Sequence, residues 1–106
     1  MKNPVGPVFR MGDEVDKILD ALEDDNPDAE IEVIDKGSYL RVQAEDFLVL
    51  TEATLQDYLG PDYRIRSLEM VMSSFAGRVL TESDSIRWQR ADLSRDAEAA
   101  KKGVLA

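Results

Sequence analysis

Neither cysteine nor histidine occurs among the 106 residues of the chain. Without cysteine the chain can form no disulfide bridge and offers no thiolate as a nucleophile or ligand. Without histidine it lacks the side chain that serves most often as a general base and as a ligand of zinc or iron. A Ser-His-Asp triad is therefore excluded. A pair of carboxylates of the glycosidase type is left open.

Long apolar segments are missing as well. No apolar run approaches the roughly 18 residues that a membrane-spanning helix needs, and the N-terminus has no apolar segment of the signal-peptide kind. The glycines do not follow the spacing of a phosphate-binding loop. These absences predict a cytoplasmic protein without membrane association.

Basic residues are outnumbered in this chain. It has 22 Asp and Glu residues against 13 Lys and Arg, which gives a net charge of -9. Phosphate backbones repel such a chain, so we expect no nucleic-acid partner. A basic patch on a partner protein is the natural complement. The length and the 43% hydrophobic content are those of one globular domain with one core.

The beginning of the chain predicts a strand followed by a helix. Pro4–Phe9 fits an edge strand, where proline is tolerated. Asp13 is expected to cap a helix that ends at Asn26-Pro27, because the residue before proline is disfavoured in the α region. The apolar stripe of this helix, at positions i, i+3, i+4 and i+7, consists of Val15, Ile18, Leu19 and Leu22.

An acidic cluster at the end of this helix resembles part of a calcium-binding loop. Asp24, Asn26 and Asp28 match the first, third and fifth positions of such a loop. The sixth position, where glycine is needed, holds Ala29, and the twelfth holds Asp35 in place of glutamate. We therefore interpret the cluster as a helix end and predict no metal site.

Strands are predicted in the next part of the chain. Ile31–Asp35 and Tyr39–Ala44 form a hairpin in which Gly37 supplies the left-handed turn residue. Phe47–Leu50 is a continuous apolar run, typical of a strand that is buried on both faces.

A second helix and a last strand follow. Thr51 is the expected N-cap of the helix, and Gly60-Pro61 ends it. Ile86–Gln89 alternates as a strand does, with Trp88 in the core. The buried face of the helix is expected to consist of Leu55, Tyr58 and Leu59.

The stretch Tyr63–Val79 predicts a long strand that ends in a loop. Leu68, Met70 and Met72 alternate with more polar positions, which is a strand pattern, and a change of phase after Ile65 predicts a bulge or a bend. Small residues around one phenylalanine then form the expected loop, Ser73–Gly77, in which Gly77 allows the turn. Such a loop suits a contact surface, and a plain turn is the alternative.

These segments together resemble the effector (coupling, or regulatory) proteins of bacterial soluble di-iron monooxygenases. The resemblance is nearest to those of toluene, alkene and isoprene monooxygenases, and the methane monooxygenase regulatory protein, which has a long N-terminal extension, is more distant. It extends from Val5 through Trp88 and includes Asp25-Asn26-Pro27. Its motifs are Gly37-Ser-Tyr-Leu-Arg-Val-Gln-Ala, Thr51-x-x-Thr-Leu-x-x-x-Leu-Gly60 and Tyr63-x-Ile-x-x-Leu68-x-Met-x-Met-Ser-Ser-Phe-Ala-Gly77-Arg.

The resemblance implies a compact single α/β (α+β) domain with two small, mostly antiparallel sheets and packed helices. We place this effector domain at residues 1–91. Residues 92–106 form a C-terminal tail to which we can assign no counterpart in the family. This tail is expected either to form a short helix over Asp96–Lys102 or to be disordered.

The resemblance also implies a protein without cofactor, metal or catalysis of its own. It would be a monomer when free, bind the di-iron hydroxylase of an aromatic or alkene monooxygenase and tune oxygen activation, substrate access and coupling. No bound small molecule is expected. A generic acidic interaction module, such as an adaptor or antitoxin, and a small-molecule binder remain alternatives. The residues expected to face the hydroxylase are Met72, Ser73, Ser74, Phe75, Ala76, Gly77, Arg78 and Asn26.

Overall fold

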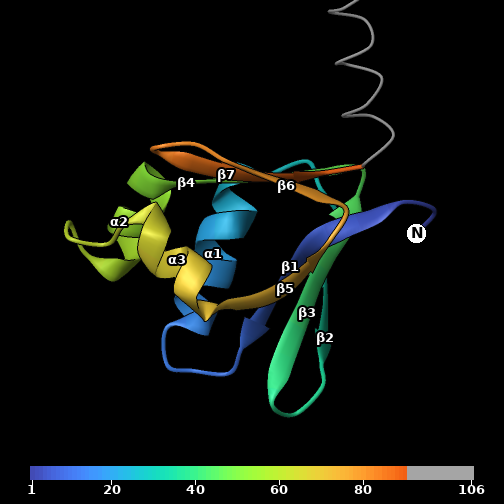
Figure 1. Ribbon diagram of the computed structural model, residues 1–106, viewed down its shortest axis with the longest axis horizontal. Coiled ribbons are helices and arrows are strands. Elements are labelled where there is room, and N and C mark those ends of the chain that lie inside the picture. The colour runs from blue at the N-terminus through green and yellow to red at the C-terminus, as the bar shows by residue number, and fades with distance from the viewer. Residues whose placement is uncertain (91–106) are drawn as a thin grey trace, which may run out of the picture.

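Two antiparallel sheets and three helices build the part of the chain that the computed structural model describes, residues 1–90 (Figure 1). The predicted α+β class with two small sheets is confirmed. The predicted tail, 92–106, lies outside the described residues. Among residues 1–90 no helix is long and apolar enough to cross a membrane.

Each sheet collects strands that are distant in the sequence. The first sheet has the order β2-β3-β1-β5, and its strands are β1 (Pro4–Arg10), β2 (Glu32–Asp35), β3 (Tyr39–Glu45) and β5 (Met72–Ala76). The second has the order β4-β7-β6, and its strands are β4 (Phe47–Thr51), β6 (Arg78–Thr81) and β7 (Ser85–Gln89).

The three helices, α1 (Val15–Asp25), α2 (Glu52–Leu59) and α3 (Ile65–Val71), gather on one side of the first sheet and beneath the second (Figure 1). They fill the space that the inner faces of the two sheets leave between them. The core therefore contains residues from every layer, among them Phe9, Ile18, Leu22, Leu40, Val42, Leu48, Leu55, Leu68, Ile86 and Trp88.

Several local predictions are confirmed. The stripe of α1 is buried or half-buried along its length, and the helix ends at Asn26. The backbone N–H of Thr54 donates to the hydroxyl of Thr51, which is the N-cap of α2, and Gly60 ends that helix. Gly37 has a φ of 90° in the β2–β3 turn, and Trp88 is in the core.

Two predictions at the beginning of the chain were wrong. β1 is an interior strand between β3 and β5, not an edge strand. Its Pro7 lies opposite Phe75, next to a shift of register after Val8 where the ladder is already interrupted. The N-cap of α1 is Glu14 rather than Asp13, and no side chain caps it. A backbone turn starts this helix instead, since the N–H of Val15 donates to the carbonyl oxygen of Gly12.

Strand β4 is buried on one face only, which corrects the prediction of two buried faces. Leu48 and Leu50 face the core, whereas Phe47 is 39% exposed on the opposite face. None of the helices in the described residues covers that outer face, so an uninterrupted apolar run here does not indicate complete burial.

The predicted strand before Met72 is a helix. Ile65 and Leu68 of α3 are buried, at the spacing i and i+3 of one helical face, and Met72, the first residue of β5, packs against the core. Met70, which supported the strand pattern, is 73% exposed. The predicted loop is also wrong in form, because Met72–Ala76 is strand β5 and only Gly77 turns.

Gly77 connects the two sheets. It has a φ of 86° and lies between β5 of the first sheet and β6 of the second. A Cβ atom at this position would be 2.6 Å from the carbonyl oxygen of Gln89 and 2.7 Å from Cγ1 of Val5. The sheets therefore approach each other where only glycine fits.

We expect Gly77→Ala to destabilise the fold more than Gly37→Ala does. Both positions have a φ near 90°, but an added Cβ at Gly37 meets nothing within 4 Å. Gly37→Ala should cost about 1–2 kcal/mol through backbone strain alone, and Gly77→Ala on the order of 3 kcal/mol or more. Denaturant unfolding of both variants measures the difference. Equal losses would contradict the close approach of the sheets.

Candidate functional site

Strand β5 is an uncharged, exposed edge of the first sheet. It pairs with β1 on one side, and Ser73, Ser74 and Phe75 are exposed. Side chains of neighbouring strand residues point to opposite faces. Ser74 lies opposite Val8 and Phe75 opposite Pro7, so the serine and the phenylalanine project to different sides of the sheet.

A bulge brings both serines to one side. The register passes from Val8 opposite Ser74 to Phe9 opposite Met72, which leaves Ser73 as the extra residue. The hydroxyl of Ser73 donates to the carbonyl oxygen of Val8 over 3.2 Å and holds the bulge. A shallow hollow of about 270 Å³ results on the outer face of the sheet, lined by Val8, Tyr39, Arg41, Ser73 and Ser74.

Phe75 lies at the other side of β5. It is 44% exposed and does not belong to the core, so its ring is available as an anchor for a partner. Ala76 is half-buried opposite Gly6, and Arg78 belongs to β6 in the second sheet. The structure thus brings Met72–Ala76 together on one edge and places Arg78 beyond the turn.

Asn26 is not part of this surface. Its side chain is buried, with 9% exposure. The amide nitrogen donates to the carbonyl oxygens of Leu22 and Val49, each over 2.7 Å, and the amide oxygen accepts from the N–H of Val49 over 3.0 Å. The side chain therefore joins the end of α1 to β4, and we leave it out of the interface.

Asp25 forms a second link between α1 and the start of α2 that sequence reasoning missed. Its carboxylate accepts from the N–H of Thr51 over 2.8 Å and from the hydroxyl of Thr54 over 2.7 Å. Beside it, the hydroxyl of Tyr58 donates to Asp24, and this hydrogen bond raises the pKa of Tyr58 to about 12. The sequence singled out Asp25 only as part of Asp25-Asn26-Pro27, and nothing in it linked this residue to Thr51, 26 positions away.

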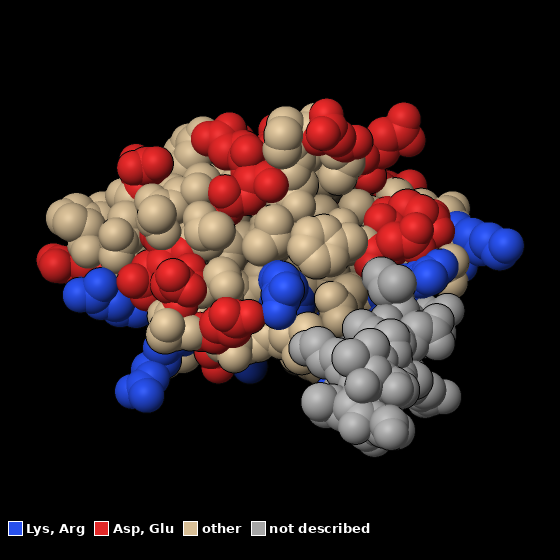
Figure 2. Space-filling view, turned by 90° about the horizontal axis from the view of Figure 1, so that it is seen from above, with Lys and Arg blue, Asp and Glu red and all other residues tan. Residues whose placement is uncertain are grey.

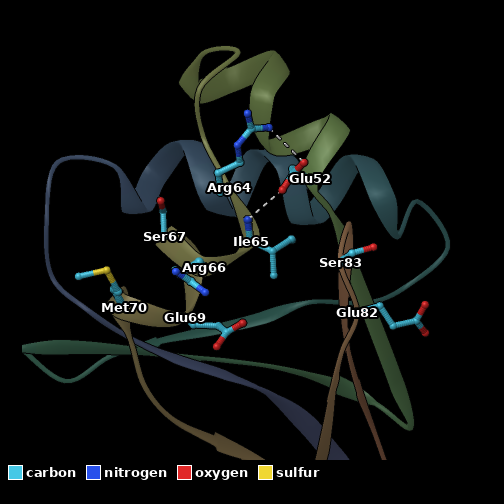
Figure 3. Close-up of a pocket in the computed structure, with 9 residues that line it drawn as sticks. All are labelled: Glu52, Arg64, Ile65, Arg66, Ser67, Glu69, Met70, Glu82 and Ser83. Carbon is cyan, nitrogen blue, oxygen red and sulfur yellow. Dashed lines mark hydrogen bonds and ion pairs between the residues drawn. The ribbon is translucent and has the colours of Figure 1, made fainter.

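A further hollow of about 480 Å³ lies between α2, α3 and the β6–β7 turn (Figure 3). Glu52 accepts from the N–H of Ile65 over 3.2 Å and forms an ion pair with Arg64 at 3.6 Å. Glu82, at the other end of the hollow from Met70, pairs with Arg87 at 2.9 Å. Two of its carboxylates are thus already held by arginines, and residues 1–90 contain no group of three side chains that could hold a metal.

The comparison with known proteins decides the family. The model of the MmoB/DmpM family matches residues 3–89, which is almost all of the described chain. The chain belongs to the MmoB/DmpM family. This confirms the resemblance found in the sequence motifs.

Known proteins resemble the chain in sequence and in structure. The effector subunit of an alkene monooxygenase system from Xanthobacter autotrophicus (strain ATCC BAA-1158 / Py2) is 39% identical over 87 residues, which cover 82% of this chain and 86% of the relative. A chain in a solved phenol hydroxylase–regulatory protein complex has a TM-score of 0.71 at 30% identity, covering 82% of this chain and 98% of that one. A second structure of such a complex gives 0.67 at 30% identity, with 82% and 99% covered.

We expect Asn26→Ala to lower the free energy of unfolding by about 1–3 kcal/mol, because the N–H of Val49 loses its acceptor in a part-buried position. Asp28→Ala, a change at an exposed neighbour, is the control and should stay within about 0.5 kcal/mol of the wild type. Denaturant melts of the two variants test this. Similar stabilities for both would show that the amide is not a structural link.

Proposed function

We propose that this chain is the effector protein of a multicomponent hydrocarbon monooxygenase and that it binds the di-iron hydroxylase of that system. The observation that carries the proposal is the match of nearly the whole described chain to a relative named as an effector subunit and to a chain solved in a complex of hydroxylase and regulatory protein. This match favours an effector over a generic adaptor or antitoxin.

The effector acts without chemistry of its own, as a cytoplasmic monomer that carries no cofactor. It tunes oxygen activation, substrate access and coupling in the hydroxylase. A bound protein can shift an equilibrium between two states only by its difference in affinity for them. The effector must therefore contact a part of the hydroxylase whose shape differs between the resting and the active state.

The β5 edge, Met72–Ala76, is the proposed working surface. Small side chains at Ser73, Ser74 and Ala76 allow a partner to approach the backbone closely. Exposed edge strands are normally protected by charges or proline. The opposite edge of the sheet, β2, carries Glu32 and Asp35, whereas β5 carries no charge. An edge without such protection is typical of a surface that a partner covers.

We expect changes in β5 to alter the reconstituted oxygenase while the isolated chain stays folded. Ser74→Leu enlarges a side chain at the proposed contact, and Phe75→Ala removes the proposed anchor. Both should change the rate of product formation or its coupling to electron consumption several-fold, with a stability loss within about 1 kcal/mol because neither residue is in the core. Steady-state turnover and thermal melts measure the two effects.

Val33→Ala on the opposite edge strand is the matched control, since Val33 is 43% exposed against 44% for Phe75. It should leave turnover unchanged. If Phe75→Ala instead melts the protein by several kcal/mol, as truncation of a core aromatic does, while Ser74→Leu stimulates normally, β5 is only scaffold.

We also expect the purified chain to contain no stoichiometric metal, flavin or haem and to turn over no hydrocarbon alone. The chain has no Cys and no His, the side chains that most often hold zinc, iron or haem. Elemental analysis and an absorption spectrum after dialysis provide the measurement. One equivalent of iron or zinc per chain would refute the cofactor-free role.

A further inference from the structure

Within residues 1–90, no helix lies over the outer face of the first sheet. In β3, Leu40, Val42 and Ala44 point into the core, so Tyr39, Arg41 and Gln43 point outward. All three helices lie on the inner side (Figure 1). Among residues 1–90, the outer side of these strands faces solvent.

The register of the sheet aligns four outward residues in one row. Ile34 lies opposite Arg41, Arg41 opposite Val8, and Val8 opposite Ser74. Such a row crosses three strand spacings, about 14 Å. At its β5 end, Val8 is the floor of the hollow, whose sides are formed by Tyr39, Arg41 and the two serines.

Arg41 supplies a cation that has no partner in the described part of the chain. The two acids of the adjacent strand β2 near this row accept hydrogen bonds from other groups: Glu32 from the side chain of Gln43 over 2.9 Å, and Asp35 from the N–H of Gly37 over 2.7 Å. In a chain with a net charge of -9, an exposed guanidinium between two apolar residues marks a place where a partner's carboxylate fits.

The second sheet offers the contrasting case. Arg87 in β7 also points outward and lies between two apolar residues, Val49 and Leu80. Glu82 pairs with it at 2.9 Å, so its charge is compensated within the chain. The view onto this sheet shows clusters of Asp and Glu around the face (Figure 2). An acidic partner would therefore be repelled there.

We propose that the hydroxylase docks on the outer face of the first sheet, presenting a carboxylate to Arg41 between apolar side chains that cover Val8 and Ile34. This inference rests on the proposed function and extends its interface from β5 to β3. The hydroxyl of Ser73 is already used by the carbonyl of Val8, so Ser74 provides the contact at the edge of the row. Tyr39 forms the far side of the hollow.

The test is the affinity of the full-length chain for its purified cognate hydroxylase, measured by titration at physiological ionic strength. Arg41→Glu should weaken binding roughly 30-fold or more, because it sets two like charges against each other. Arg87→Glu is the matched control and should change the affinity by less than about threefold, as expected for a residue outside the interface. Arg41→Gln, which removes the charge but keeps a polar side chain, should fall between the wild type and Arg41→Glu.

Each outcome decides a separate point. A wild-type chain that does not bind the hydroxylase contradicts the proposed function itself. Wild-type binding with unchanged affinity for both Arg41 variants overturns only the docking face, and so do equal losses for Arg41→Glu and Arg87→Glu. If Arg41→Glu does not fold, Arg41→Gln alone decides. A wild type that sediments as a dimer, which Arg41→Gln dissociates without loss of hydroxylase affinity, would assign the face to a second copy of the chain and overturn the proposal.

Discussion

The close approach of the two sheets at Gly77 is the constraint on which the rest of the structure depends. The backbone of Gly77 lies against Gln89 and Val5, one residue from each sheet, and no side chain fits between them. The chain therefore leaves the first sheet immediately after β5 and continues as β6 of the second. No later strand in the described residues returns to cover β5, and its edge stays open. A turn that is fixed by packing thus produces the surface that we assign to the hydroxylase.

Elsewhere in the molecule, hydrogen bonds of polar side chains, rather than a turn, join the elements: they connect the end of α1 to β4. Asp25 and Asn26, at the end of α1, bind the backbone of Thr51 and Val49. Several hydrogen bonds join the end of α1 to β4 at one place, because both side chains use more than one polar atom. These hydrogen bonds fix the end of α1 against the second sheet and against the start of α2.

Sequence patterns correctly predicted those helices and strands that carry a regular apolar pattern or a clear cap of their own. Helix α1 has a complete apolar stripe, α2 has a true cap at Thr51, and β3 and β7 alternate regularly. Helix α3 was missed because its few apolar residues fit the period of a strand as well as that of a helix. Only the burial of Leu68 and the exposure of Met70 in the folded chain distinguish the two.

Pairings between distant segments could not be predicted in the same way. Whether β1 is central depends on β5, and their contact at Ser73 and Val8 joins residues 65 positions apart. The family motifs pointed to the residues of the β5 edge but not to the side on which each lies. They also gave no reason to place Arg41 beside Ser74, because that neighbourhood exists only through the register of β1 with two other strands.

The charge distribution has a consequence for the free effector. An open, uncharged strand edge invites pairing with the same edge of another copy, which is a route to aggregation. The net charge of -9 opposes this, because two copies repel each other before their edges meet. This repulsion acts over the Debye length, about 8 Å at physiological ionic strength, and weakens as the salt concentration rises. The acidic surface therefore gives the chain colloidal stability, so that the β5 edge can remain exposed for a partner without causing aggregation.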